Sequence, residues 1–110
     1  MAKPEKASEI IKSLSDRFKS EKSPDFELIY HFEISGDNGG DFTVKIDSGN
    51  IDVSEGLHGN AKCVIKAKDK DYEDLELGRS NPQMAVMMGK VKVSNIGSML
   101  KFIEMFEKLS

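Results

Sequence analysis

The chain has 110 residues, the length of a single domain with one modest hydrophobic core. Its 38% hydrophobic and 32% charged residues are typical of a folded globular protein, which excludes a disordered or fibrous chain. A net charge of −3 and the absence of Trp argue against a general nucleic-acid binder, so we expect one domain over residues 1–110 and no nucleic-acid partner.

The N-terminal segment has the spacing of an amphipathic helix. Its apolar residues recur at intervals of three and four and form a single stripe: Ala7, Ile10, Ile11, Leu14 and Phe18. Pro4 fits the first turn, where the missing N–H is not needed. Because a residue before proline is disfavoured in the α region, we predict that the helix ends before Ser23-Pro24.

The period of the apolar residues changes to two from Phe26 onward, which predicts strands with one buried face. The first strand alternates through Phe26, Leu28, Tyr30, Phe32 and Ile34, and after the glycine-rich loop at 36–40 the second contains Phe42, Val44 and Ile46. A turn at 47–50 leads to a short third strand with Ile51 and Val53, and a fourth runs through Ala61, Cys63, Ile65 and Ala67. We expect three of these strands to form an antiparallel meander.

Two short helices are predicted between residues 69 and 89. Asp69 can cap the first, and Gly78 can end it in the left-handed conformation. The second has its cap and first residue at Asn81-Pro82 and is stopped by Gly89. Its apolar face consists of Met84, Met87 and Met88.

The remaining segment supplies a strand and a helix. Residues 90–93 are too few for a helix between their flanking breakers and are predicted as a fifth strand. The closing helix has a stripe that Phe102 and Met105 widen: Ile96, Met99, Leu100, Ile103 and Phe106.

These elements predict an α+β fold with a five-stranded, mostly antiparallel sheet and helices covering one of its faces. The alternation leaves only one apolar sheet face, so all the helices should lie on it. One face of five strands is a small area for four apolar helices. The space between them is therefore either packed solid or encloses a cavity.

Residues 78–93 carry a motif of glycine, an Asn-Pro step, alanine, an apolar pair and then Gly-Lys-apolar-Lys-apolar. This motif resembles the sterol carrier protein 2 family, and the positions that match are Gly78, Asn81, Pro82, Ala85, Met88, Gly89, Lys90 and Lys92. The order of elements extends the resemblance over nearly the whole chain. The chain departs from the family at Ser94, where a glycine is frequent, and in ending Glu107-Lys108-Leu109-Ser110 without a peroxisomal Ser-Lys-Leu address.

The resemblance implies a carrier without catalytic machinery that holds a lipid (a sterol, fatty acid, acyl-CoA or phospholipid) in an apolar tunnel between sheet and helices. Methionine suits such a lining because it is flexible and polarisable. Pattern alone favours methionines that merely fill core gaps, and the resemblance reverses this preference. The predicted lining residues are Phe32, Val44, Leu75, Met84, Met87, Met88, Met99, Phe102, Ile103 and Phe106.

Lysines follow the outward side of the fourth and fifth strands. If those strands are neighbours, Lys62, Lys66, Lys68, Lys90 and Lys92 form a basic patch. Such a patch suits the phosphates of acyl-CoA or transient contact with an anionic membrane surface, for which we name Lys90, Lys92, Lys62 and Lys66. The alternative is a solvated strand edge that prevents aggregation.

No catalytic, metal-ligand or phosphate-loop spacing is present, so we expect neither an enzyme nor a bound cofactor or metal. His31 lies on the outward side of the first strand, His58 lies in a loop, and Cys63 points inward as a small hydrophobe. One cysteine permits no internal disulfide, and no secretory signal or membrane-spanning run is found. We expect a cytoplasmic protein.

The sequence therefore predicts a monomeric intracellular lipid carrier. The alternative is a protein-interaction or dimerisation module in which the same apolar helices, Ile96 to Leu109 above all, dock on a partner or on a second copy.

Overall fold

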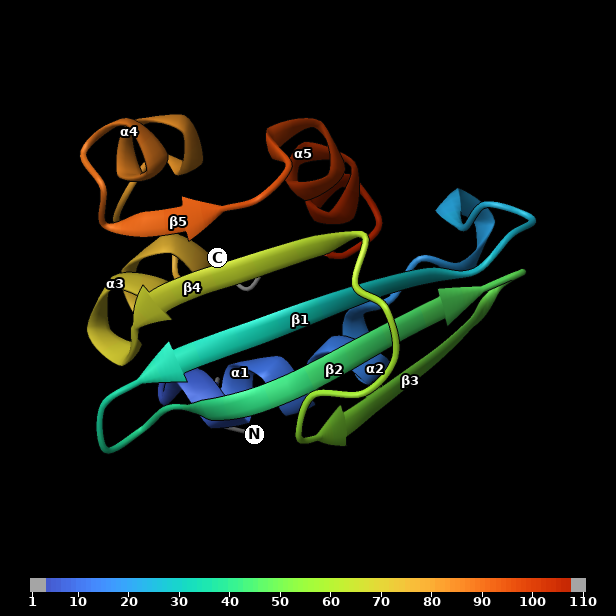
Figure 1. Cartoon of the computed structure of the whole chain (residues 1–110), viewed down its shortest axis with the longest axis horizontal. Coiled ribbons are helices and arrows are strands. Elements are labelled where there is room, and N and C mark those ends of the chain that lie inside the picture. The colour runs from blue at the N-terminus through green and yellow to red at the C-terminus, as the bar shows by residue number, and fades with distance from the viewer. Residues whose placement is uncertain (1–3, 108–110) are drawn as a thin grey trace.

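A five-stranded sheet is the framework of the fold in a computed structural model, which describes residues 4–107 (Figure 1). The strands are β1 (Leu28–Ser35), β2 (Gly40–Asp47), β3 (Asn50–Glu55), β4 (Cys63–Lys68) and β5 (Val91–Val93), in the spatial order β3-β2-β1-β4-β5. Only the β1–β4 pair is parallel among these strands of residues 4–107. The predicted fold class is confirmed. Residues 108–110 lie outside the described residues. They include the end of the segment from Ile96 to Leu109 that the sequence analysis named as a docking segment.

The predicted meander is formed by β1, β2 and β3. In its register Tyr30 lies opposite Val44 and Phe32 opposite Phe42. These side chains are buried on one face of the sheet, because alternate residues of a strand point to the same side. Phe26 does not take part, since β1 begins at Leu28 and the Phe26 side chain is exposed.

The fourth strand returns beside β1 rather than beside β3. Residues 56–62 cross the outer face of the sheet on the way (Figure 1), where the Thr43 hydroxyl donates to Gly56 O at 2.7 Å and accepts from His58 N at 2.9 Å. The amide of Lys62 then donates to Ile29 O at 2.7 Å. This loop explains why Thr43 is buried although it points away from the helices.

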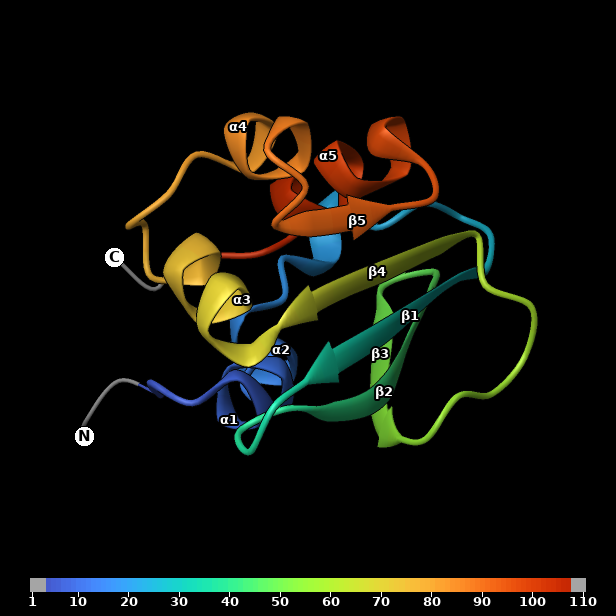
Figure 2. The ribbon, with the colours of Figure 1, turned by 60° about the vertical axis from the view of Figure 1, so that its left-hand side comes forward.

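The predicted N-terminal helix is divided into α1 (Ala7–Lys12) and α2 (Leu14–Arg17), followed by the 3-10 turn η1 (Ser20–Lys22). The break lies at Ser13, whose hydroxyl donates to Ile10 O at 2.7 Å and so competes with the helix backbone. Phe18 is outside the helix and forms an isolated antiparallel bridge with Phe106. Both helices lie against the apolar face of the sheet (Figures 1 and 2).

The remaining helices are α3 (Asp69–Glu76), α4 (Pro82–Met87) and α5 (Ile96–Glu104). Asp69 is the first residue of α3 rather than its cap, and its carboxylate accepts from Asn38 N at 3.0 Å. The cap of α4 is as predicted, since the Asn81 side chain accepts from the amides of Gln83 and Met84. Among the helices of residues 4–107, none combines the length and apolar character that crossing a membrane requires.

The position of α4 differs from the prediction. It packs against β5 and lies beyond this edge strand in both views, rather than over the sheet face (Figures 1 and 2). Gly89, with φ of +75°, turns the chain directly from α4 into β5, so the helix stays at the edge. The prediction that every helix covers one sheet face was therefore wrong for α4.

Candidate functional site

A cleft of about 620 Å³ opens between α2, α3, the α3–α4 loop and α5. Its apolar lining is formed by Leu14, Leu75, Pro82, Phe102, Ile103 and Phe106. Its polar lining is formed by Arg17, Glu76, Gly78, Arg79, Ser80, Asn81 and Glu107. The space left by the helices is thus an open cleft with a charged rim rather than an enclosed apolar cavity.

Phe102 and Phe106 connect the cleft to the core. The ring of Phe102 lies 5.4 Å from Phe32 and 4.6 Å from Phe106, measured between centroids. Phe106 in turn lies 5.6 Å from Phe18. Aromatic contacts at these distances stabilise beyond the burial of area alone. The apolar wall of the cleft is therefore held by the same packing that holds the fold.

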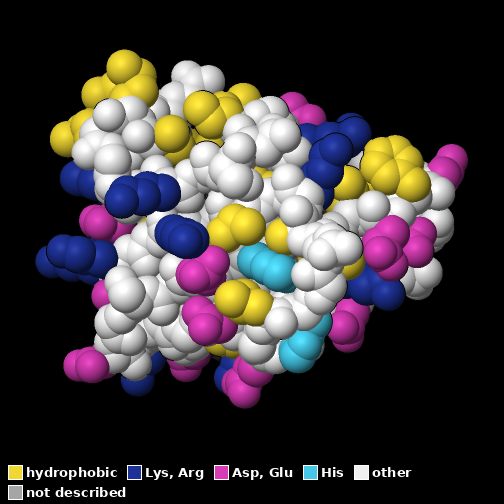
Figure 3. Space-filling view, in the orientation of Figure 1, with side chains coloured by type: hydrophobic (Ala, Val, Ile, Leu, Met, Phe, Trp, Pro, Cys, Tyr) yellow, Lys and Arg dark blue, Asp and Glu magenta, His cyan; other side chains and the backbone are white. Residues whose placement is uncertain are grey.

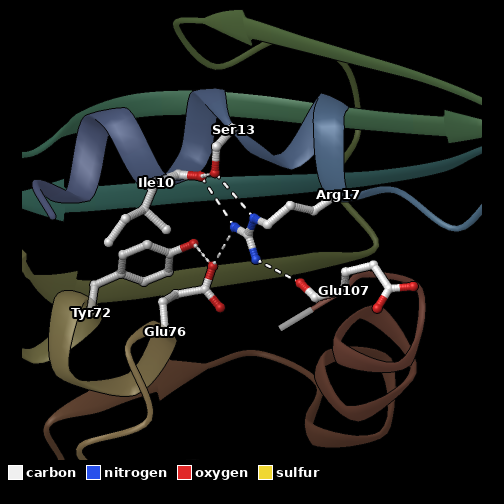
Figure 4. Close-up of polar contacts among 6 residues, drawn as sticks. All are labelled: Ile10, Ser13, Arg17, Tyr72, Glu76 and Glu107. Carbon is white, nitrogen blue, oxygen red and sulfur yellow. Dashed lines mark hydrogen bonds and ion pairs between the residues drawn. The ribbon is translucent and has the colours of Figure 1, made fainter. Parts of the chain in front are cut away.

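The rim of the cleft contains a polar network centred on Arg17 (Figure 4). Its Nε donates to Ser13 Oγ at 3.1 Å, and its Nη1 donates to Glu107 O at 3.1 Å. Its Nη2 donates to Ile10 O and to Glu76 Oε2, both at 3.2 Å. The side chains of Arg17 and Glu76 are only 12% and 22% exposed, so this ion pair is well shielded from water.

Tyr72 extends the network into the core, because its hydroxyl donates to Glu76 Oε2 at 3.1 Å. Burial, followed by the negative charge of Glu76 and this hydrogen bond, raises the pKa of Tyr72 well above its usual value. The phenol therefore stays protonated and remains a donor. The network joins α2, α3 and the segment after α5, three elements that border the cleft.

The predicted lining residues fall into three groups. Leu75, Phe102, Ile103 and Phe106 line the cleft. Phe32, Val44 and Met99 are buried in the core and line no part of it. Met84, Met87 and Met88 are 53%, 81% and 62% exposed.

The three methionines point outward because α4 buries its opposite side. Ala85 is buried, and it is small enough to let the helix approach β5 closely. Met84, Met87 and Met88 share the other side of the helix, as predicted, but as placed they do not line the cleft. We call these three side chains the methionine face.

Several cleft residues were missed by the sequence reasoning. Leu14 belongs to the predicted helix stripe, and residues 78–82 belong to the motif that carries the family resemblance, so a signal for both was present. Arg17, Glu76 and Glu107 were missed because charged residues on predicted helices ordinarily indicate a solvated face.

A second groove, of about 670 Å³, lies beside the methionine face. Met88 lines it together with four lysines: Lys66, Lys68, Lys90 and Lys92. The prediction that their strands are neighbours is confirmed, and Lys66 lies directly opposite Lys92. Lys62 lies apart from them, before the start of β4. Figure 3 shows hydrophobic side chains over α4 and basic side chains next to them over the sheet edge.

Among residues 4–107, the two histidines and the cysteine form no arrangement typical of catalysis. His31 Nε2 lies 2.8 Å from His58 O, and His58 Nε2 lies 2.9 Å from Glu55 O, so each imidazole is bonded to backbone. Cys63 is fully buried, and burial raises the pKa of its thiol. Within residues 4–107, no group of three or more His, Cys, Asp or Glu side chains could hold a metal ion.

Comparison with known families identifies the family of this domain. The model of the SCP-2 sterol transfer family matches residues 7–107. The chain belongs to this family. The resemblance found in the sequence motif is thereby confirmed. The SCP-2 family assignment supports a role in lipid binding or transfer and leaves the specific ligand open.

A curated relative is similar over part of its length. The hydroxysteroid dehydrogenase-like protein 2 of Bos taurus is 34% identical over 85 residues, which are 76% of this chain and 19% of the relative. The chain thus spans about a fifth of the curated relative that it matches.

Two solved structures illustrate the shared SCP-2 fold. The sterol carrier protein domain 2 of Helicoverpa armigera is 26% identical, with a TM-score of 0.63, over 87% of this chain and 81% of that one. A sec-alkylsulfatase from Pseudomonas sp. is 14% identical, with a TM-score of 0.78, over 92% of this chain and 16% of that one. At that identity the likeness to the sulfatase concerns the fold alone.

Proposed function

We propose that this SCP-2 domain is a non-catalytic lipid carrier that holds the apolar chain of its ligand in the cleft between α2, α3 and α5. The observation that carries the proposal is the apolar wall of Phe102, Ile103 and Phe106, which faces a space of about 620 Å³. This volume is within the range of roughly 300–1,000 Å³ typical of small-molecule sites. The cytoplasmic location expected from the sequence stays a prediction.

The binding free energy in this proposal comes from desolvation of the ligand. Each methylene that leaves water contributes about 0.8 kcal/mol, so a partly buried acyl chain gains several kcal/mol without a specific polar contact. This driving force has no preferred direction. The chain or ring system of a fatty acid, acyl-CoA, sterol or phospholipid can therefore pack against the wall.

We further propose that the carrier loads at an anionic bilayer through the methionine face. Supporting this, three exposed methionines adjoin Lys90 and Lys92, and neither lysine forms an ion pair within residues 4–107. Apolar side chains enter the acyl boundary while lysines meet lipid phosphates, each contributing about 1 kcal/mol. The α3–α4 loop borders the cleft and leads into α4, so docking brings the cleft close to the bilayer.

The carboxylates near this surface do not remove its basic character. Glu33 lies in the second groove but is paired with Lys66 at 3.9 Å. Asp41 and Asp71 also line this groove, but its four lysines outnumber its three carboxylates. The same lysines also suit the phosphates of acyl-CoA. Lys62 has no part in this proposal, because it lies apart from the groove.

The alternative function, a dimerisation or interaction module, draws support from the exposed Ile96 and Leu100 of α5 and from the methionine face. Self-association through the methionine face would bring Lys90 and Lys92 of two copies together, which electrostatic repulsion disfavours. We therefore keep the monomeric carrier as the proposal. Sedimentation with and without lipid distinguishes the two, since a carrier gains ligand mass and a module changes its association state.

The carrier function is tested by blocking the cleft. Ile103 lines it and is only half-buried, so Ile103→Asp places a charge on the apolar wall with little damage to the core. We expect this variant to lose uptake of a pyrene-labelled long-chain alcohol and of the matched acid. Met87→Asp is the control, since Met87 is exposed and outside the cleft. Unchanged binding by a folded Ile103→Asp protein would contradict the assignment of the cleft.

A further inference from the structure

The hydrogen-bonding capacity of Arg17 is almost completely used inside the protein. A guanidinium has five N–H donors. Four of these donate to Ser13 Oγ, Ile10 O, Glu76 Oε2 and Glu107 O. A single N–H, on Nη1, remains for a ligand. Arg17 therefore joins the elements around the cleft and has no bidentate face to offer a carboxylate.

The second arginine of the cleft is largely exposed, so water screens any ion pair that it forms. Arg79 Nη1 lies 3.5 Å from Asp74 Oδ1 in an exposed pair. The cationic lining residues, Arg17 and Arg79, are matched in number by the acidic lining residues Glu76 and Glu107. A ligand carboxylate entering the cleft would thus meet one arginine whose donors are almost all used, one arginine that water screens, and two carboxylates. This arrangement disfavours a free fatty acid at the polar end of the cleft.

Acceptor capacity remains open on Glu76. Its Oε2 accepts from both Tyr72 and Arg17, as Figure 4 shows. Among the described residues, Oε1 accepts no hydrogen bond. A ligand hydroxyl can donate to this oxygen, and a donor bonded to a carboxylate forms the stronger, charge-assisted type of hydrogen bond. Its oxygen can accept in turn from an N–H donor of the rim.

We propose that the cleft selects amphiphiles whose polar end is an uncharged hydroxyl over those that end in a carboxylate, with Glu76 as the residue that recognises the hydroxyl. The proposal rests on the carrier function proposed above. The alkyl chain of the ligand packs against the apolar wall of Phe102 and Phe106, and its polar end lies at the rim beside Arg17 and Glu76. Selectivity comes from the charge balance of the rim rather than from the apolar wall, which is equally suited to both ligands.

The test compares three ligands with the same alkyl chain: hexadecanol, hexadecanoate and the methyl ether of hexadecanol. Each displaces a pyrene-labelled alcohol from the wild-type chain at neutral pH. We expect hexadecanol to bind about tenfold more tightly than hexadecanoate, the ratio that a single discriminating hydrogen bond supports. The ether, which has no donor, should also bind more weakly than the alcohol. This comparison requires no variant.

Glu76→Gln should then abolish the selection. The amide keeps an oxygen for Tyr72 and removes the counter-charge of Arg17, so hexadecanoate should gain on hexadecanol by about tenfold. Asp71→Asn is the matched control, because it removes a carboxylate from the same helix but outside the cleft, and it should leave the ratio unchanged.

Each outcome bears on the proposal. If hexadecanoate binds the wild-type chain as tightly as hexadecanol or more tightly, the role given to Glu76 is wrong while the carrier function stands. The same conclusion holds if Asp71→Asn shifts the ratio of the two affinities as much as Glu76→Gln does. If none of the three ligands displaces the probe, the carrier function itself fails and the selectivity fails with it.

Discussion

The rings of Tyr30 and Phe102 lie 4.6 Å apart between centroids, and this contact joins β1 to α5. The Tyr30 hydroxyl also donates to Ser98 O of the same helix at 3.1 Å. The helix is thus fixed to the sheet by an aromatic contact and by a polar one. Since Phe102 also lines the cleft, the width of the ligand site depends on the packing of the core.

Removal of the Phe102 ring should strongly destabilise the fold. Phe102→Ala deletes a buried aromatic that contacts Tyr30, Phe32 and Phe106, and such truncations cost about 3–5 kcal/mol. Ile96→Ala on the same helix is the control, because Ile96 is exposed and surface changes stay within about 0.5 kcal/mol. Urea unfolding monitored by circular dichroism measures both. A similar loss in the two variants would contradict the docking of α5 described here.

Arg17 should contribute far more to stability than Arg79. Arg17→Ala removes four hydrogen bonds and leaves the carboxylate of Glu76 without its counter-charge. Because the pair is partly exposed, we expect a cost of about 2–3 kcal/mol, below the roughly 3–5 kcal/mol of a fully buried pair. The side chain of Arg79 is 62% exposed, so Arg79→Ala should cost less than about 1 kcal/mol. Thermal and urea unfolding of the two variants give the comparison. Equal losses would mean that the network around Glu76 is not shielded in solution.

The two tyrosines of the chain should make it sensitive to alkaline pH. Burial, with a smaller contribution from Cys63, raises the pKa of Tyr30 to about 12, and the pKa of Tyr72 is also raised. The unfolded chain loses these protons above pH about 10, whereas the folded chain keeps them. The unfolded state then binds fewer protons than the folded state. The stabilisation that the two protonated tyrosines give is therefore complete below pH about 10 and is lost as the pH rises above that value.

Ultraviolet absorbance of tyrosinate tests this directly, because the chain has no Trp. A free tyrosine is half ionised at pH about 10. At the same pH we expect little tyrosinate in the folded protein. Its appearance should coincide with unfolding monitored by circular dichroism. Tyr72→Phe should reduce the pH dependence of stability and leave the part due to Tyr30. Ordinary titration of both tyrosines in the folded chain would show that neither hydroxyl is shielded.

Local patterns predicted the elements of this fold well. Alternation through Tyr30 and Phe32, followed by glycines at the turn, was sufficient for the β1–β2 hairpin, and Asn81 with Pro82 correctly marked the start of α4. The parallel pairing of β1 with β4 could not be derived in this way. The alternation of Cys63 and Ile65 tells which face is buried, but it does not tell which strand is the neighbour.

The candidate site was only partly predictable for a related reason. Spacing placed Met84, Met87 and Met88 on one side of a helix, but the burial of that side depends on what the opposite side contacts. Ala85 packs inward because α4 lies at the sheet edge, a tertiary feature. The Arg17 network joins residues far apart in the chain, so no local pattern reveals it.

Membrane docking through the methionine face should require both charge and apolar side chains. In flotation with vesicles of phosphatidylcholine and phosphatidylserine, Lys90→Gln with Lys92→Gln should weaken binding by about tenfold or more, since each lysine contributes about 1 kcal/mol. Met84→Ser with Met87→Ser should weaken it as well, and added salt should reproduce the effect of the lysine variant. Vesicles of phosphatidylcholine alone should bind poorly.

The charge-matched control for this experiment is Lys12→Gln with Lys45→Gln, two lysines of α1 and β2 that lie outside the second groove. If this variant loses binding as strongly as the Lys90 and Lys92 variant, the attraction is due to overall charge and the docking surface is wrong. If the methionine variant instead changes the sedimentation of the lipid-free protein, the face binds a second copy. Wild-type protein that binds neither kind of vesicle would contradict docking at a bilayer. Docking at this face predicts that vesicle binding and pyrene-alcohol transfer decline together in the lysine and methionine variants, while uptake of free probe stays unchanged.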